Sequence, residues 1–183
     1  MTGPRTPAPG RLPPVDEAHL DDERRAVIQQ VAAGRGRIPT PYRVWVASPA
    51  LARRLHPLGQ YLAGLTSLTK PEAEIVILSA ARRWGGDYVL AVHAREADDA
   101  GLDASVVAAI AAGHAAEPAD PRQRAVADMM AALGSDSTPP DGIFDAAVAM
   151  LGHGGVAEAL ALAGYFTAIA LAMKMYAVPL PAE

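Results

Sequence analysis

Apolar residues recur at helical spacing along most of the chain and are separated by breaks that contain proline or glycine. Residues 21–33 place two valines and an isoleucine on one face after an acidic first turn. Residues 48–65 begin with Ser-Pro, which is typical of a helix start, and continue with leucines at helical spacing. The pattern predicts a helix in each segment, and the Pro-Thr-Pro sequence at 39–41 predicts an extended turn between them.

A helix hairpin is predicted in the middle of the chain. Thr69 can cap a helix over 71–84, Gly85-Gly86 ends it, and a second helix follows over 87–100. Two helices joined by such a short turn form an αα-hairpin. Beyond it, apolar segments predict helices over 104–113, 121–133, 139–151 and 156–176, the last two separated by Gly152-His153-Gly154-Gly155.

Composition supports an all-α fold. Hydrophobic residues make up 51% of the chain but aromatic residues only 5%, and alanine is the commonest residue. This balance favours close helix packing over a β-sandwich. The proline-rich segment 1–15 is expected to form a disordered or loosely packed tail. Residues 16–183 are long enough to form a single domain with its own core.

Charge and hydropathy exclude several classes of partner. The net charge is −4 and no stripe of Lys and Arg is present, so we expect no nucleic-acid partner. The longest uncharged apolar stretch, 159–173, is shorter than the ~20 residues of a membrane span, so we expect no membrane partner. The first residues lack the apolar stretch of a secretory signal, so we expect a cytoplasmic location. The absence of cysteine excludes thiolate nucleophiles and disulfides.

The first helix of the hairpin carries one acidic residue on its apolar side. On a helical wheel, Glu74 projects about 40° from the centre of the apolar face, a costly position for a charge without a partner or a function. The apolar side carries Ile77, Leu78, Ala81 and Trp84, and the polar side carries Glu72, Ser79, Arg82 and Arg83.

The second helix repeats this arrangement with a histidine. His93 falls among apolar residues, whereas its charged neighbours gather on the other side. Counting from the turn leaves Glu74 and His93 roughly one helical turn apart in height, so they can meet. A carboxylate beside an imidazole fixes the ring tautomer and provides a proton shuttle near neutral pH. The spacing alone equally allows a buried structural pair, or a pair that binds a neighbouring subunit.

The residues of this hairpin resemble the carboxymuconolactone decarboxylase and alkylhydroperoxidase-like (AhpD-like) family. The similarity covers residues 70–112 and extends more weakly over most of the chain. It implies an AhpD-like helical bundle built round a central helix hairpin, assembled as a homo-oligomer (dimer, trimer or hexamer). The similarity rests on Glu74, Gly85-Gly86, Tyr88, His93 and Ala100-Gly101-Leu102, and in the flanks on Pro41-Tyr42-Arg43, Ser48-Pro49 and Gly164-Tyr165-Phe166.

The resemblance also implies a function. Glu74 and His93 match the family's proton-relay residues, whereas the two cysteine positions of the peroxidase branch hold Gly86 and Val89 here, so we expect no thiol peroxidase activity. The decarboxylase branch performs cofactor-free acid/base chemistry on a carboxylated lactone. We therefore expect a lyase of the carboxy-lyase type without a cofactor, with His93 as general acid/base and Glu74 orienting or protonating it. Many relatives carry a histidine where Ala47 stands here, so their substrate does not carry over directly.

A non-catalytic interpretation stays open. The chain would then be a small-molecule-binding or assembly member of the family, in which the Glu74–His93 pair only stabilises the hairpin.

Four other residues are candidates for binding a small-molecule substrate. Trp84 and Tyr88 flank the hairpin turn and could line a pocket, although aromatic residues at such a turn more often serve packing. Tyr42 and Arg43 could contact a substrate carboxylate, although a solvated loop is the commoner arrangement. No metal is predicted, because the remaining histidines share no metal-ligand spacing and are expected on the surface or in loops: His19, His56, His114 and His153.

Overall fold

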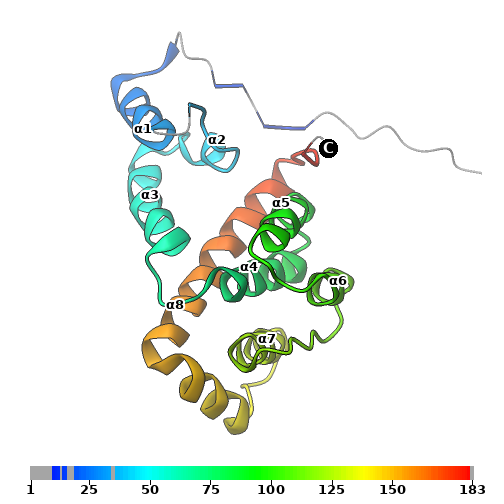
Figure 1. Ribbon diagram of the computed structural model, residues 1–183. Helices are drawn as coiled ribbons and strands as arrows, with labels where there is room; N and C mark the ends of the chain where they lie inside the picture. Colours follow the sequence, from blue (N-terminus) through cyan, green and yellow to red (C-terminus); the bar gives the residue numbers. More distant parts are fainter. Residues whose placement is uncertain (1–9, 13, 16–18, 34–35, 182–183) are drawn as a thin grey trace, which may run out of the picture.

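The computed structural model describes residues 10–12, 14–15, 19–33 and 36–181, and over these residues the chain is all α (Figure 1). This confirms the fold class. The described residues form eight helices and no strand: α1 (Asp22–Ala32), α2 (Tyr42–Trp45), α3 (Pro49–Gly64), α4 (Lys70–Trp84), α5 (Asp87–Asp99), α6 (Ala104–Ala112), α7 (Pro121–Leu133) and α8 (Asp141–Met175).

Two elements differ from the sequence prediction. The Pro-Thr-Pro turn runs directly into the short helix α2, because Pro41 adopts helical angles (φ −61°, ψ −33°) and the Tyr42 N–H donates to the Pro39 carbonyl over 2.9 Å. The break predicted between the helices at 139–151 and 156–176 is confirmed at Gly152, whose non-helical angles (φ 67°, ψ 167°) separate two helical segments that share the label α8. The second segment differs from the prediction in that it begins directly after Gly152.

The predicted N-terminal tail lies largely outside the described residues. Within its described part, the Arg11 N–H donates to the Tyr176 carbonyl over 2.8 Å. Arg11 therefore lies beside the end of α8.

The central hairpin is fixed by its glycines. Gly85 ends α4 in the left-handed conformation (φ 65°), which glycine adopts at little cost. Gly86 packs directly on α8, where a Cβ atom would lie 2.6 Å from the Cβ of Ala170. The turn therefore sets both the direction of α5 and its close approach to α8.

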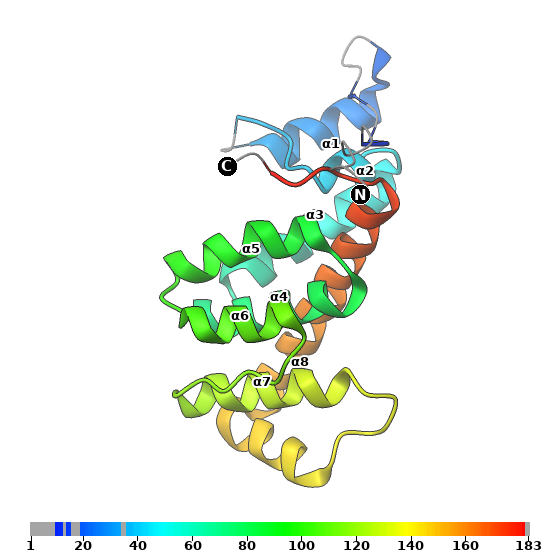
Figure 2. The ribbon, with the colours of Figure 1, turned by 90° about the vertical axis from the view of Figure 1, so that its right-hand side faces the viewer.

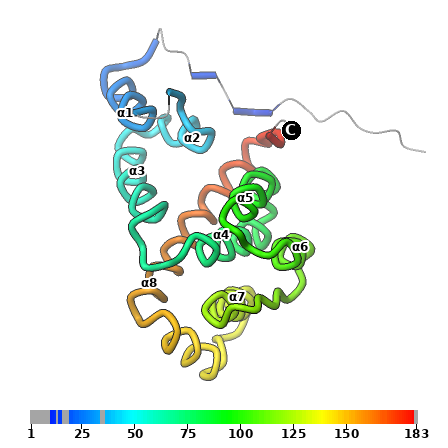
Figure 3. Tube along the Cα trace, viewed as in Figure 1, coloured from blue at the N-terminus to red at the C-terminus, as the bar shows by residue number. Residues whose placement is uncertain are grey.

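The buried apolar residues form two clusters. The larger joins α4 to α5, α6, α7 and α8, and Figure 2 shows α5, α6 and α7 one below another with α8 running past them. The smaller joins α1, α2 and α3, and Trp45 packs against both. The trace in Figure 3 shows α3 and α5 on opposite sides of α8, which both of them contact. A single domain over 16–183 stays a prediction.

Two positions of α4 differ from the helical-wheel prediction. Glu72, expected on the polar side, is only 2% exposed, because Arg122 of α7 reaches it over 2.7 Å. Trp84, expected on the apolar side, is 45% exposed. It is the last residue of α4, and a helical wheel does not predict which side of a helix end is covered by other helices.

One described helix, α8, is long and apolar enough to span a membrane by length and composition. One such helix is weak evidence of a span, because the core helix of a soluble protein passes the same test; 33% of the apolar window of α8 is buried, and α8 contacts α3, α4, α5 and α7. The kink at Gly152 separates residues 141–151 from residues 153–175.

Candidate active site

The hairpin brings Glu74 and His93 into contact. The Nδ1 atom of His93 lies 2.8 Å from Oε2 of Glu74, and their side chains are 17% and 7% exposed. The two residues therefore meet, as the spacing in the sequence allowed. A pair this close and this buried is held by both helices.

The contact orients the imidazole ring. When Glu74 is ionised, its carboxylate only accepts hydrogen bonds, and Nδ1 of His93 is the donor. In the neutral ring Nε2 is then the acceptor, and in the charged ring it is the donor. The ring of Phe166 packs edge-on against His93, with centroids 4.8 Å apart, and restricts its rotation. His93 is thus a positioned proton donor and acceptor.

Glu74 and His93 line a cavity of about 410 Å³. Its walls come from α2 and the segment before it and from α3, α4, α5 and α8, so it lies where the two apolar clusters meet. The volume suits a small organic molecule. Four charged side chains line it: Arg37, Lys70, Glu74 and Glu96.

A pair of phenols forms another part of the cavity wall. The hydroxyl oxygens of Tyr42 and Tyr165 lie 3.4 Å apart, and the Tyr42 ring meets the ring of His56 edge-on at a centroid distance of 5.7 Å. The Tyr165 ring also packs against Phe166, with centroids 5.7 Å apart. A continuous row of aromatic rings therefore links the phenols to His93.

The predicted substrate-binding residues divide into two groups. Tyr42 and Tyr88 line the cavity, and the Tyr88 hydroxyl donates to Oγ1 of Thr40 over 3.0 Å. Trp84 and Arg43 are not among the cavity-lining residues. The structure thus brings Tyr42 and Tyr88, but neither Trp84 nor Arg43, to the cavity that holds Glu74 and His93.

Sequence reasoning missed a histidine of the site. His56, expected on the surface or in a loop, is 5% exposed inside α3 and lines the cavity. Ala52, one helical turn earlier, is buried as well, but the helical spacing of the leucines in this segment did not mark that face. The other histidines within the described residues, His19, His114 and His153, are exposed as expected.

No three His, Asp or Glu side chains of the described residues come close enough together to hold a metal ion.

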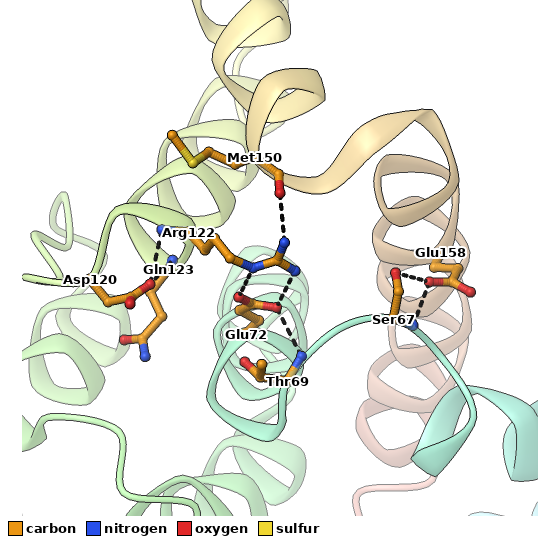
Figure 4. Close-up of polar contacts among 8 residues, drawn as sticks. All are labelled: Ser67, Thr69, Glu72, Asp120, Arg122, Gln123, Met150 and Glu158. Atoms are coloured by element: carbon orange, nitrogen blue, oxygen red, sulfur yellow. Dashed lines mark hydrogen bonds and ion pairs between the residues drawn. The ribbon is translucent and has the colours of Figure 1, made fainter.

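A separate polar cluster holds the start of α4 in place (Figure 4). The Arg122 guanidinium donates to both carboxylate oxygens of Glu72, over 2.7 and 3.2 Å, and to the Met150 carbonyl over 2.6 Å. On the other side, the backbone N–H and hydroxyl of Ser67 donate to Glu158 of α8. These bonds fix α4 against α7 and α8, and so fix the position of Glu74.

Comparison with known proteins gives no match: no family model fits the sequence, and no curated protein or solved structure is significantly similar to it. The function must therefore be argued from the site itself.

Proposed function

We propose that this protein is a cofactor-independent acid/base enzyme that acts on a small carboxylated, lactone-like molecule by decarboxylation or a related proton transfer. The observation that carries the proposal is the 2.8 Å contact between Glu74 and His93 on the wall of a cavity of about 410 Å³. The resemblance of the hairpin to the carboxymuconolactone decarboxylase and AhpD-like family supports the same chemistry and an AhpD-like bundle.

His93 is the general acid/base of the proposed reaction. In decarboxylation the bond between the carboxylate and its carbon breaks, carbon dioxide leaves, and the remaining electron pair takes up one proton. Charged His93 supplies that proton from Nε2, while Glu74 holds Nδ1 and stabilises the imidazolium. Water then returns a proton to the ring, so the balance is one substrate carboxylate and one proton consumed for each carbon dioxide released.

Two cations can receive the substrate's carboxylate. Arg37 and Lys70 line the same cavity, and both side chains are partly open to solvent. Cationic donors form short, charge-assisted hydrogen bonds with carboxylates. Glu74 and Glu96 line the same cavity, so the preference for a carboxylate would come from these two cations and not from the net charge of the wall.

The test is to incubate the purified protein with carboxylated lactones, without added cofactor, and to follow the loss of one carbon dioxide by mass spectrometry. The wild type should release carbon dioxide. His93→Ala should slow this release by about 10²–10⁴-fold, the usual contribution of a general acid/base. His153→Ala, which removes an exposed histidine outside the cavity, should leave it unchanged.

Glu74 acts through His93, so its variant needs a different readout. Glu74→Gln retains a hydrogen-bond acceptor but removes the charge that stabilises the imidazolium. The alkaline limb of the pH–rate profile, where the charged general acid His93 loses its proton, should therefore move to lower pH in this variant, which a purely structural role would not produce. If His93→Ala and Glu74→Gln lower the stability but wild type converts no carboxylated lactone, the non-catalytic binding interpretation replaces the enzymatic one.

A further inference from the structure

A second cavity lies along α4 and shares no lining residue with the first. Its volume is about 450 Å³, and its walls come from α4, from the end of α6 and the link after it, and from α7. Three residues from the polar side of α4 line it: Ser79, Arg82 and Arg83. Glu72, the fourth residue of that side, binds Arg122 instead. A polar helix side that lines a cavity can bind a polar ligand.

The wall of this second cavity is positively charged. Arg82 and Arg83 line it together with His114, and none of the described lining residues is Asp or Glu. The first cavity differs, because two carboxylates balance its two cations. The chain as a whole carries a net charge of −4, so two unbalanced cations in one cavity do not follow from its composition. The second cavity therefore favours an anion.

Both guanidinium groups are available to bind that anion. The side chain of Arg82 makes no hydrogen bond or ion pair with any residue that the structure describes. Arg83 reaches Asp136 over 3.9 Å, and both of these side chains are exposed, so the pair is weak. A guanidinium group presents its N–H donors in a planar fork that matches the oxygens of a phosphate or a carboxylate. Two such groups match a doubly charged anion.

Two small residues complete the polar part of the wall. Gly113 ends α6 at φ 78°, and a Cβ atom there would lie 3.0 Å from Nη2 of Arg82, so a glycine leaves room for the guanidinium. Ser79 is half-buried in α4, and its hydroxyl makes no hydrogen bond to another described residue. It lies three and four positions before the two arginines, on the same side of the helix. The hydroxyl can therefore donate to the same anion as the arginines.

The rest of the wall indicates what else the ligand carries. Small and apolar residues form it: Ile110, Ala115, Ala116, Ala127, Met130 and Ala131. A volume of about 450 Å³ lies in the range of cavities that hold a small organic molecule. The ligand that fits has a doubly charged group at one end and an apolar body at the other.

We propose that this cavity binds a phosphate monoester, with the phosphate held by Arg82 and Arg83 and the organic group against α7. A phosphate monoester carries between one and a half and two negative charges at pH 7 and has three terminal oxygens that accept hydrogen bonds. The two arginines, the Ser79 hydroxyl and an N–H of His114 supply donors for these oxygens. The site is separate from the Glu74–His93 cavity, and the proposal does not depend on the acid/base function.

Calorimetric titration with phenyl phosphate, at constant ionic strength, tests the site. The wild type should bind it at millimolar concentration or below. Inorganic phosphate, which lacks the ring, and benzoate, which carries one charge, should bind more weakly. Arg82→Gln and Arg83→Gln should each weaken binding about tenfold, the lower end for hydrogen bonds between charged groups because both arginines are exposed. Arg54→Gln, which removes an exposed arginine of α3 outside both cavities, should leave binding unchanged.

An added carboxylate provides an independent check. Ala131 is an exposed residue of α7 that lines the cavity, so Ala131→Glu places a negative charge there without disturbing the core. This variant should lose phenyl phosphate binding without a lower melting temperature. Ala108→Glu adds the same charge to an exposed position of α6 outside the cavity and should bind as wild type does.

Arg37→Gln distinguishes this site from the first cavity, which Arg37 lines. If Arg37→Gln abolishes binding while Arg82→Gln and Arg83→Gln bind as wild type does, the phosphate occupies the first cavity and the proposal is overturned. Absence of wild-type binding at millimolar concentration, or equal binding of phenyl phosphate and inorganic phosphate, also overturns it. Binding that depends on Arg82 and Arg83 upholds the site whether or not the protein releases carbon dioxide from any substrate.

Discussion

Glu72 is a buried carboxylate that its partners keep ionised. Its side chain is 2% exposed, and Arg122 and the Thr69 N–H donate to it over 2.7 to 3.2 Å. Burial by itself raises the pKa of a carboxylate, but the hydrogen bonds from Arg122 and Thr69 outweigh it and hold the pKa of Glu72 below its ordinary value. The charge of Glu72 is therefore part of the folded structure.

Replacing Glu72 should destabilise the fold in a pH-dependent way. The pKa of Glu72 is lower in the folded chain than in the unfolded chain. Its contribution to the free energy of unfolding is therefore complete above the ordinary carboxyl pKa, and it is lost as the pH falls through the pKa of the folded state. Glu72→Gln should lower the free energy of unfolding at pH 7 by about 2 kcal/mol, less than for a fully buried pair because Arg122 is 38% exposed. The difference from wild type in urea unfolding should shrink toward pH 3.

Glu117→Gln is the matched control for that experiment. Glu117 is exposed and lies 4.0 Å from Arg124, a surface pair of little value. Its replacement should change the unfolding free energy by less than about 0.5 kcal/mol at both pH values. An equal effect of the two variants would mean that the Glu72–Arg122 bonds add nothing to stability.

Single residues were predictable from the sequence only where local spacing decides their environment. Glu74 and His93 stand out because each breaks the apolar face of its own helix, and the hairpin turn fixes their relative height. The burial of Glu72 depends on Arg122, fifty positions away, which no helical wheel of α4 includes. The burial of His56 likewise depends on Tyr42 and on the cavity beyond it.

At the scale of elements, the kink in α8 depends on one glycine. Gly152 has φ 67° and ψ 167°, a combination that is almost restricted to glycine, whereas the helix resumes directly after it. The carbonyl of Met150, just before the kink, accepts from Arg122. The bend therefore places the first half of α8 against α7 and the second half against the cavity.

Two glycine substitutions, two positions apart, should have opposite effects on stability. Gly152→Ala forces a side chain into this restricted conformation and should lower the free energy of unfolding by about 1–3 kcal/mol. Gly154→Ala adds a methyl group in a helical segment, where no atom lies within 4 Å of it. This change should raise the free energy of unfolding by about 0.5–1 kcal/mol. Chemical denaturation measures both, and a stabilising Gly152→Ala would show that α8 runs straight.

Most helix boundaries were predictable because local residues set them. Thr69, Asp120 and Gly85 cap helix ends in the structure where the sequence places their signals. The short helix α2 was not predictable in this way. In α8 the glycine-rich segment predicted the break at Gly152, but not that helical angles resume directly after it.

At the scale of the whole molecule, the cavity exists because the chain builds two apolar clusters. The smaller cluster supplies Tyr42, and the larger supplies Ile77, Val89, Leu162 and Ile169. The α-helical class was predictable from composition. The contact between the two clusters was not, because no local sequence pattern specifies it. His56 was therefore expected on the surface or in a loop, and Tyr165 was not among the predicted site residues, although both line the cavity.

The outer face of α8 carries apolar residues that no other part of the described chain covers. Leu160, Leu171 and Met175 are 45%, 42% and 71% exposed, and they fall on one side of the helix. Gly164 lies on the same side, with open space where a side chain would be. Contiguous exposed apolar residues on a helix mark an interaction surface. A second copy of the chain is the occupant that the family resemblance implies.

We predict that the protein is a homo-oligomer held together through this face of α8. Leu171→Glu places a charge in the interface, where burial without a partner is unfavourable, and should weaken association by more than about tenfold. Light scattering coupled to size exclusion should then show monomers for this variant and a larger species for wild type. Ala108→Glu adds the same charge to an exposed position of α6 and should leave the assembly intact. A monomeric wild type would contradict the prediction, and a wild type that dissolves only with detergent would assign the same face to lipid.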